Sequence, residues 1–95
     1  MDDNLLIYEN KHFRLEQCYT YPIPGYLILN LKIEVRSLSE MTNGALVALG
    51  RTLSLAIKAI EAVVKPERVY CAAFGEESNF IHFHLFPRTR WLLST

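Results

Sequence analysis

A single long amphipathic stretch limits the folds open to this chain of 95 residues. From Ser37 to Val64, apolar side chains recur every three or four residues, which is the spacing of one face of a helix. Ser37 and Glu40 have the spacing of a capping box, and Thr42 is another possible N-cap. Pro66 follows the stretch, and the residue before a proline resists the helical conformation. We therefore predict one helix from about Thr42 to Val64, with an apolar stripe made of Leu46, Leu49, Leu53, Ala56, Ile57, Ile60 and Val64.

The segments on either side of this helix have the patterns of strands. They are short apolar runs or alternate apolar with polar residues, at 5–8, 13–18, 26–33, 69–74 and 80–86. Turn-forming residues at 9–12 and 19–25 separate the first three, and Pro87 is expected to end the last. The order is β-β-β-α-β-β. It predicts an α+β fold, with a single domain over residues 1–95, an antiparallel sheet of about five strands and one long helix packed on one face.

The charge balance excludes several classes of partner. Ten basic and ten acidic residues give a formal net charge of zero, whereas a general nucleic-acid clamp needs a field of one sign. The apolar runs are far shorter than the ~18–20 residues that span a membrane, and the acidic N-terminus lacks a signal core. We expect a cytoplasmic protein with no nucleic-acid or membrane partner. Because 51% of the residues are hydrophobic, part of this small surface is expected to face a second copy in a homodimer.

Two of the three histidines stand close together on the last predicted strand. Alternate residues of a strand share a face, so the residues expected under the helix are Ile81, Phe83 and Leu85. The open face then carries Phe80, His82, His84 and Phe86. The two imidazoles would lie about 6–7 Å apart, where they can serve as nucleophile, general acid or base, or metal ligand. Two partly exposed histidines that merely fill a β surface would show the same pattern.

Other candidate residues favour packing over chemistry. A metal centre is not expected, because it would need extra ligands such as His12, which only a coincidence of folding would bring near. Cys18 and Cys71 are interpreted as small buried apolar side chains. The aromatic group beside the Pro-Gly turn is expected to pack in the turn and core, with a purine pocket as the alternative; it consists of Tyr19, Tyr21 and Tyr26.

Over about residues 5–91 the sequence resembles the histidine triad family. The run 82–88, HFHLFPR, resembles the end of the family signature, in which histidines alternate with apolar residues and Pro-Arg often follows. Upstream, 24–29 is similar to the family's Pro-Gly-His strand, 37–42 to its helix entry, and 69–75 to the strand and glycine before the triad. The resemblance implies a compact antiparallel sheet with a helix, a homodimer and nucleotide binding. Many members cleave a phosphoanhydride or phosphoramidate at the α-phosphate, and others transfer nucleotidyl groups.

The resemblance also assigns roles by position. His82 matches the nucleophile that forms a nucleotidyl-histidine intermediate, and His84 matches the histidine that contacts phosphate oxygens. Arg88 would balance phosphate charge. Further hydrogen bonds to the ligand would come from the 75–79 loop, namely from Gly75, Ser78 and Asn79. The implied ligand is a nucleotide or a dinucleoside polyphosphate, and we expect no cofactor.

Several positions depart from the family pattern. Phe80 replaces the first histidine of the triad, and Tyr26 replaces the histidine after Pro-Gly. Cys18 stands where the family commonly has a ribose-binding Asp or Asn, and Glu76 where some members have a phosphate-binding Gln. Two interpretations therefore follow from the sequence. The chain is a hydrolase or nucleotidyl transferase that uses His82, or a non-catalytic dimeric binding module of the same fold that has lost ribose recognition and activity.

Overall fold

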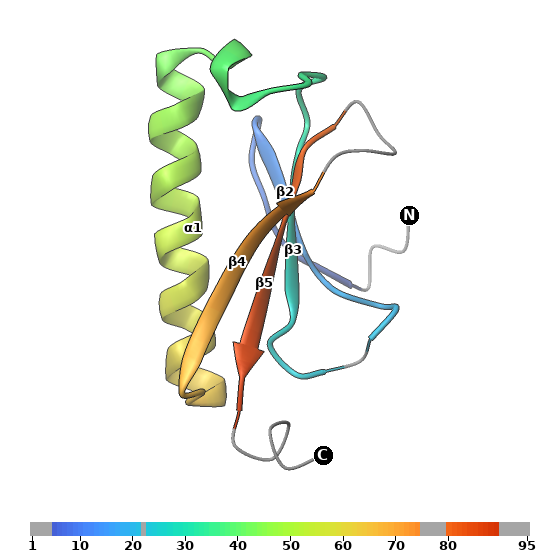
Figure 1. The fold of residues 1–95 in the computed structure, drawn as a ribbon, viewed down its shortest axis with the longest axis vertical. Helices are drawn as coiled ribbons and strands as arrows, with labels where there is room; N and C mark the ends of the chain where they lie inside the picture. The colour runs from blue at the N-terminus through green and yellow to red at the C-terminus, as the bar shows by residue number, and fades with distance from the viewer. Residues whose placement is uncertain (1–4, 22, 75–79, 90–95) are drawn as a thin grey trace.

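The computed structural model describes residues 5–21, 23–74 and 80–89, and within these ranges five strands and one α-helix form two layers (Figure 1). The strands are all antiparallel and belong to one sheet with the order β1-β2-β3-β5-β4. This confirms the predicted α+β fold. In chain order the elements are β1 (Leu6–Glu9), β2 (Phe13–Gln17), β3 (Leu27–Leu31), a 3₁₀ helix (Leu38–Glu40), α1 (Asn43–Val64), β4 (Arg68–Phe74) and β5 (His82–Arg88).

The core lies between α1 and one face of the sheet, and Figure 1 shows the helix running along that face. Alternate side chains of the central strands are buried there, as a strand period of two requires. The prediction that the odd-numbered residues of the last strand pack under the helix is confirmed, because Ile81, Phe83 and Leu85 belong to this core. The even-numbered residues of β3 and β5 consequently face the opposite side of the sheet.

The sequence contains two N-cap signals for the long helix, and the structure uses one of them. Thr42 is the N-cap of α1, and its hydroxyl accepts a hydrogen bond from the amide of Ala45 at 3.2 Å. Ser37 and Glu40 do form a capping box, but it closes the separate 3₁₀ helix. The two capping residues, Ser37 and Thr42, lie so close in the sequence that the pattern alone does not show which of them begins the long helix. The helix ends at Val64 as predicted.

The predicted apolar stripe is shifted slightly around the helix axis. Leu46 is 38% exposed and does not belong to the core, whereas Ala45 and Thr52 are buried. The residues that face the sheet are spaced three or four apart, and Leu46 lies one position, about 100°, away from that line. Thr52 is tolerated there because its hydroxyl donates to the carbonyl of Ala48 at 2.7 Å. The buried residues of α1 are Ala45, Leu49, Thr52, Ala56 and Ile60.

The prediction that Pro87 ends the last strand is wrong. β5 begins at His82 and continues through Pro87 to Arg88. Its pairing with β3 ends at the Leu27–Leu85 pair, so beyond that point β5 pairs with β4 alone. A proline lacks the amide proton of other strand residues. This loss is tolerated at a position that has a neighbouring strand on only one side.

β4 lies at an edge of the sheet, where it pairs with β5 and with no other strand of the described residues. Cys71 on this strand is exposed, so its interpretation as a buried apolar residue is wrong, whereas Cys18 is buried as predicted. An edge strand that the helix covers only in part leaves both of its faces accessible. Over the residues that the structure describes, no helix is both long enough and apolar enough to span a membrane.

Candidate functional site

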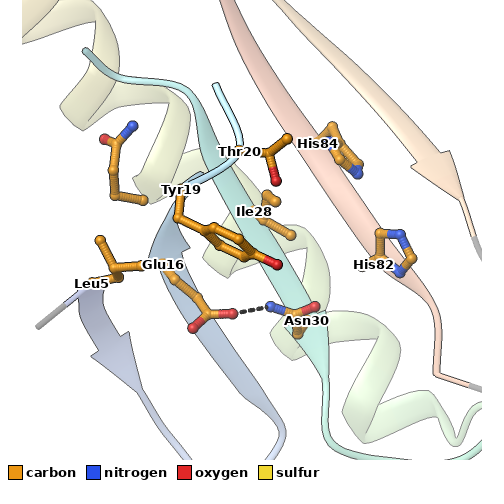
Figure 2. A pocket seen from close by; sticks show the side chains of 9 residues that line it. Leu5, Glu16, Tyr19, Thr20, Ile28, Asn30, His82 and His84 are labelled. Atoms are coloured by element: carbon orange, nitrogen blue, oxygen red, sulfur yellow. Dashed lines mark hydrogen bonds between the residues drawn. The ribbon is translucent and has the colours of Figure 1, made fainter. Parts of the chain in front are cut away.

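The face of the sheet opposite α1 contains a pocket of about 630 Å³ (Figure 2). Three strands and the segments beside them contribute to it. Figure 2 shows Leu5 and Glu16 at one side, His82 and His84 at the other, and Asn30 and Ile28 between them. The lining residues are Leu5, Glu16, Gln17, Tyr19, Thr20, Ile28, Asn30, His82 and His84.

Strand register explains why the two histidines share this pocket with residues of β3. His82 pairs with Asn30, and His84 pairs with Ile28. Directly opposed residues of an antiparallel pair have their Cβ atoms only about 4.5–5.5 Å apart. The imidazole rings of the two histidines lie 5.3 Å apart between centroids, with their planes inclined by 57°. The structure therefore brings together the two residues that the sequence singles out as catalytic.

His82 presents one ring nitrogen to the backbone. Its Nδ1 lies 3.5 Å from the carbonyl oxygen of Phe80, at the long limit of a hydrogen bond. A carbonyl oxygen only accepts, so a hydrogen bond here places the proton of a neutral His82 on Nδ1 and the lone pair on Nε2. Phe80 itself is 43% exposed and stands before the first residue of β5. The position that is histidine in the triad thus contributes its backbone carbonyl here.

His84 contacts the side chain of Tyr26, the residue just before β3. Its Nδ1 lies 2.8 Å from the hydroxyl of Tyr26. Burial, and secondarily the neighbouring His82, lower the pKa of His84 below its usual 6.5. Burial is also the main reason that the pKa of Tyr26 is raised above its usual 10.0. Both groups are therefore neutral near pH 7, and the phenol keeps the proton that it can share with the imidazole.

Aromatic packing holds Tyr26 in this position. Its ring meets that of Phe86 edge to face, with centroids 5.1 Å apart. It also stacks on Tyr21, with centroids 6.3 Å apart and an interplanar angle of 4°. Of the tyrosines that the sequence offers for a purine pocket, Tyr19 lines the pocket, whereas Tyr21 and Tyr26 form this cluster beside it.

Glu16 and Asn30 are the polar pair of the pocket that sequence reasoning missed. The amide nitrogen of Asn30 donates to a carboxylate oxygen of Glu16 at 2.8 Å (Figure 2). Among the described residues that line the pocket, Glu16 is the one that carries a formal charge, and neither lysine nor arginine is among them. The signal in the sequence is the alternation of the strand, because Asn30 is a polar residue at an open-face position of the third predicted strand.

The remaining predicted site residues fall into two groups. Arg88 lies on the same face of β5 as the histidines but outside the pocket lining, and its guanidinium donates to the hydroxyl of Tyr70 at 3.1 Å. The loop positions lie outside the described residues, and they are Gly75, Glu76, Ser78 and Asn79. Over the described part of the chain, no three side chains of His, Cys, Asp or Glu gather in a way that could hold a metal ion.

Solved structures with the same architecture define the class of fold. The Hit-like protein involved in cell-cycle regulation from Bartonella henselae, solved with an unknown ligand, has a TM-score of 0.76 and 18% identity over 96% of this chain and 74% of that one. A HIT family protein from Bacillus anthracis has a TM-score of 0.75 and 18% identity over 88% of this chain and 63% of its own. The NitFhit protein of C. elegans has a TM-score of 0.81 and 14% identity over 96% of this chain and 23% of its own. The fold is therefore HIT-like.

The similarity is one of structure. No protein-family model matches the sequence, and no curated protein is significantly similar to it. This chain spans less than two thirds of the B. anthracis protein and a small part of the C. elegans protein. At these identities the comparisons establish the fold, and the chemistry must be argued from the pocket.

Proposed function

We propose that this protein binds a nucleotide in the pocket and acts on its α-phosphate, as a hydrolase or a nucleotidyl transferase, with His82 as the nucleophile. The observation that carries the proposal is the projection of His82 and His84 from one central strand into a pocket of about 630 Å³. This volume lies within the range typical of small-molecule sites. The HIT-like fold and the unknown ligand of the B. henselae structure support a small molecule as the ligand.

In the proposed reaction the lone pair on Nε2 of His82 forms a bond to the α-phosphorus. The bond between phosphorus and the leaving group breaks, and the leaving group takes its electron pair. Water, or a second acceptor in a transferase, then attacks the phosphorus of the nucleotidyl-histidine. The N–P bond breaks, its electron pair returns to Nε2, and the proton of the attacking hydroxyl passes to solvent.

His84 supports this step as a hydrogen-bond donor. When the hydroxyl of Tyr26 donates to Nδ1, the neutral ring of His84 carries its proton on Nε2. That N–H can bind a non-bridging phosphate oxygen, whose negative charge grows in the transition state. The two histidines then offer complementary atoms, a lone pair on His82 and a proton on His84.

A non-catalytic binding module is the second candidate, and it rests on Phe80. Its exposed aromatic side chain replaces an imidazole at the first triad position, so one polar group of the family site is lost. Under this alternative, nucleotides bind and raise the unfolding temperature by mass action, but no turnover depends on His82.

Both candidates are proposed to act as homodimers. β4 pairs with β5 on one side, and no described strand pairs with its other side. Such open edges are templates for pairing between chains. Two apolar side chains of α1 also lie largely exposed, Leu55 at 67% and Val63 at 83%. A second copy of the chain could cover both features at once.

The test combines binding with turnover. Thermal shift is measured with AMP, GMP and a dinucleoside polyphosphate, and hydrolysis of the last is followed for four proteins. These are wild type, His82→Ala, His84→Ala and His12→Ala. The third variant removes the histidine that lies outside the pocket and serves as the control.

We expect His82→Ala to abolish turnover, and His84→Ala to lose roughly 30- to 1,000-fold, the usual cost of one donor to a developing anion. His12→Ala should retain wild-type activity. Equal turnover by wild type and His82→Ala would refute the mechanism. Binding without turnover in every variant would establish the binding module instead.

A further inference from the structure

The pocket has two ends of different character. The end on β5 carries His82 and His84, whose imidazole N–H groups can donate to an anion. The end on β2 carries the carboxylate of Glu16, which repels one. One oxygen of that carboxylate accepts from Asn30, and the carboxylate has further acceptor capacity for a ligand. A simple phosphate would satisfy only the histidine end.

We propose that Glu16, oriented by Asn30, selects ligands that present hydrogen-bond donors to the end of the pocket remote from the histidines. For a nucleotide these donors are the amino edge of the base or the hydroxyls of the sugar. The inference rests on the proposed function, since it assumes a nucleotide whose phosphate lies at His82.

The order of the strands supports this polarity. β3 separates β2 from β5, and Glu16 and His84 both pair with Ile28 of β3. Because neighbouring strands lie about 4.8 Å apart, the backbones of Glu16 and His84 are about 10 Å apart across the sheet, and His82 lies two residues further along β5. A phosphate over β5 places the sugar over Ile28 and Asn30 of β3, and the base over β2. The amino edge of the base is therefore the foremost candidate for Glu16, and the sugar hydroxyls are the alternative source of donors.

Discrimination should come from the cost of an unsatisfied carboxylate. A ligand that covers Glu16 without donating a hydrogen bond removes water from the carboxylate and does not replace the hydrogen bonds that the water made. Sites that bind polar groups of their ligands reject analogues lacking those groups more strongly than apolar pockets reject extra methylenes. Because Glu16 is only half-buried, we expect a difference of roughly 10-fold in Kd between matched ligands.

The experiment is calorimetric titration of wild type, Glu16→Leu, Glu16→Gln and Glu61→Leu. Glu61 is an exposed glutamate of α1 outside the pocket, so its replacement is the matched control. Two ligand pairs test the base, AMP against purine riboside 5′-monophosphate and GMP against IMP. One pair tests the sugar, AMP against 2′,3′-dideoxy-AMP. Thermal unfolding of each variant verifies folding, and Glu16→Gln retains the size of the side chain should Glu16→Leu fold poorly.

We expect wild type and Glu61→Leu to prefer the ligand with the donor roughly 10-fold, and Glu16→Leu to reduce the preference to less than about 3-fold. A preference confined to the base pairs, or to the sugar pair, identifies the source of the donors. Nucleotide binding with no preference in wild type, or with a preference that survives both Glu16 variants, would overturn this inference and leave the proposed function standing. No binding of any nucleotide to wild type would overturn both.

Discussion

The replacement of Gly25 by alanine is expected to destabilise the protein sharply, for two independent reasons. Gly25 has a φ of +85°, a backbone conformation that residues with a Cβ atom rarely adopt. A Cβ atom at this position would lie 2.6 Å from Cγ2 of Val64, well inside van der Waals contact, and 3.5 Å from atoms of Ile60 and Pro87. The chain therefore turns into β3 directly against the last turns of α1, at a place with no room for a methyl group.

Both costs can be given a magnitude. A left-handed conformation costs an L-residue about 1–2 kcal/mol. An extra methyl group in a packed region typically costs about 1–3 kcal/mol through displaced side chains and backbone. The combined loss of about 2–5 kcal/mol is a large part of the roughly 5–15 kcal/mol that stabilises a typical domain. At about 4–8 °C per kcal/mol for a chain of this size, the Tm of Gly25→Ala should fall by roughly 10 °C or more.

Thermal and urea denaturation test this expectation, with Gly50→Ala as the control. A Cβ atom at Gly50 meets nothing within 4 Å, so alanine in that exposed helical position should stabilise the protein by about 0.5–1 kcal/mol. The steric part of the Gly25 effect is isolated by adding Val64→Ala, and the double variant should lose less stability than the two single losses together. A Gly25→Ala protein as stable as wild type would refute the reasoning.

Three further predictions concern the site, the assembly and the helix start. His84 should titrate below pH 6.5 by NMR, and His82→Ala should raise the pKa of His84 because a neighbouring positive charge is removed. An unchanged His84 pKa in this variant would contradict the coupling. In wild type the unfolded chain binds this proton more tightly than the folded chain does, so the contribution of His84 to folding stability should be lost as pH falls below 6.5. Light scattering at micromolar concentration should show a dimer, and Cys71→Asp on the exposed edge strand should shift it to monomer, whereas a monomeric wild type would exclude this interface. Thr42→Ala should cost about 1 kcal/mol in urea denaturation through loss of the α1 N-cap, and no loss would mean that the cap is dispensable.

The parts of the fold that sequence alone predicts are those governed by local period. The 3.6-residue spacing between Thr42 and Val64 defined the helix, and the two-residue spacing around Phe83 assigned the histidines to the open face. Boundaries set by neighbouring elements were not predictable in this way. The strand continues through Pro87 because its partner on one side has already ended, which is a property of the sheet and not of the segment.

The missing half of the site has the same explanation. Glu16 and Asn30 enter the pocket because β5 inserts between β3 and β4, and this places Asn30 beside His82, far away in the sequence. Neither residue belongs to a local motif. The contact between Tyr26 and His84 joins residues 58 positions apart and likewise depends on the register of β3 with β5.

The contact between Tyr26 and His84 bears on whether the proposed chemistry can proceed with a tyrosine at position 26, where the family that the sequence resembles has a histidine. A site that uses a nucleophile and a neighbouring donor needs the proton on different ring atoms of two adjacent imidazoles. Here the carbonyl of Phe80 accepts from Nδ1 of His82, and the hydroxyl of Tyr26 can donate to Nδ1 of His84. The carbonyl can only accept, whereas the phenol can donate as well as accept, so these two contacts are compatible with opposite tautomers of the two rings. A tyrosine therefore can supply what the chemistry requires of this position, provided that the phenol stays protonated, and its raised pKa ensures that it does.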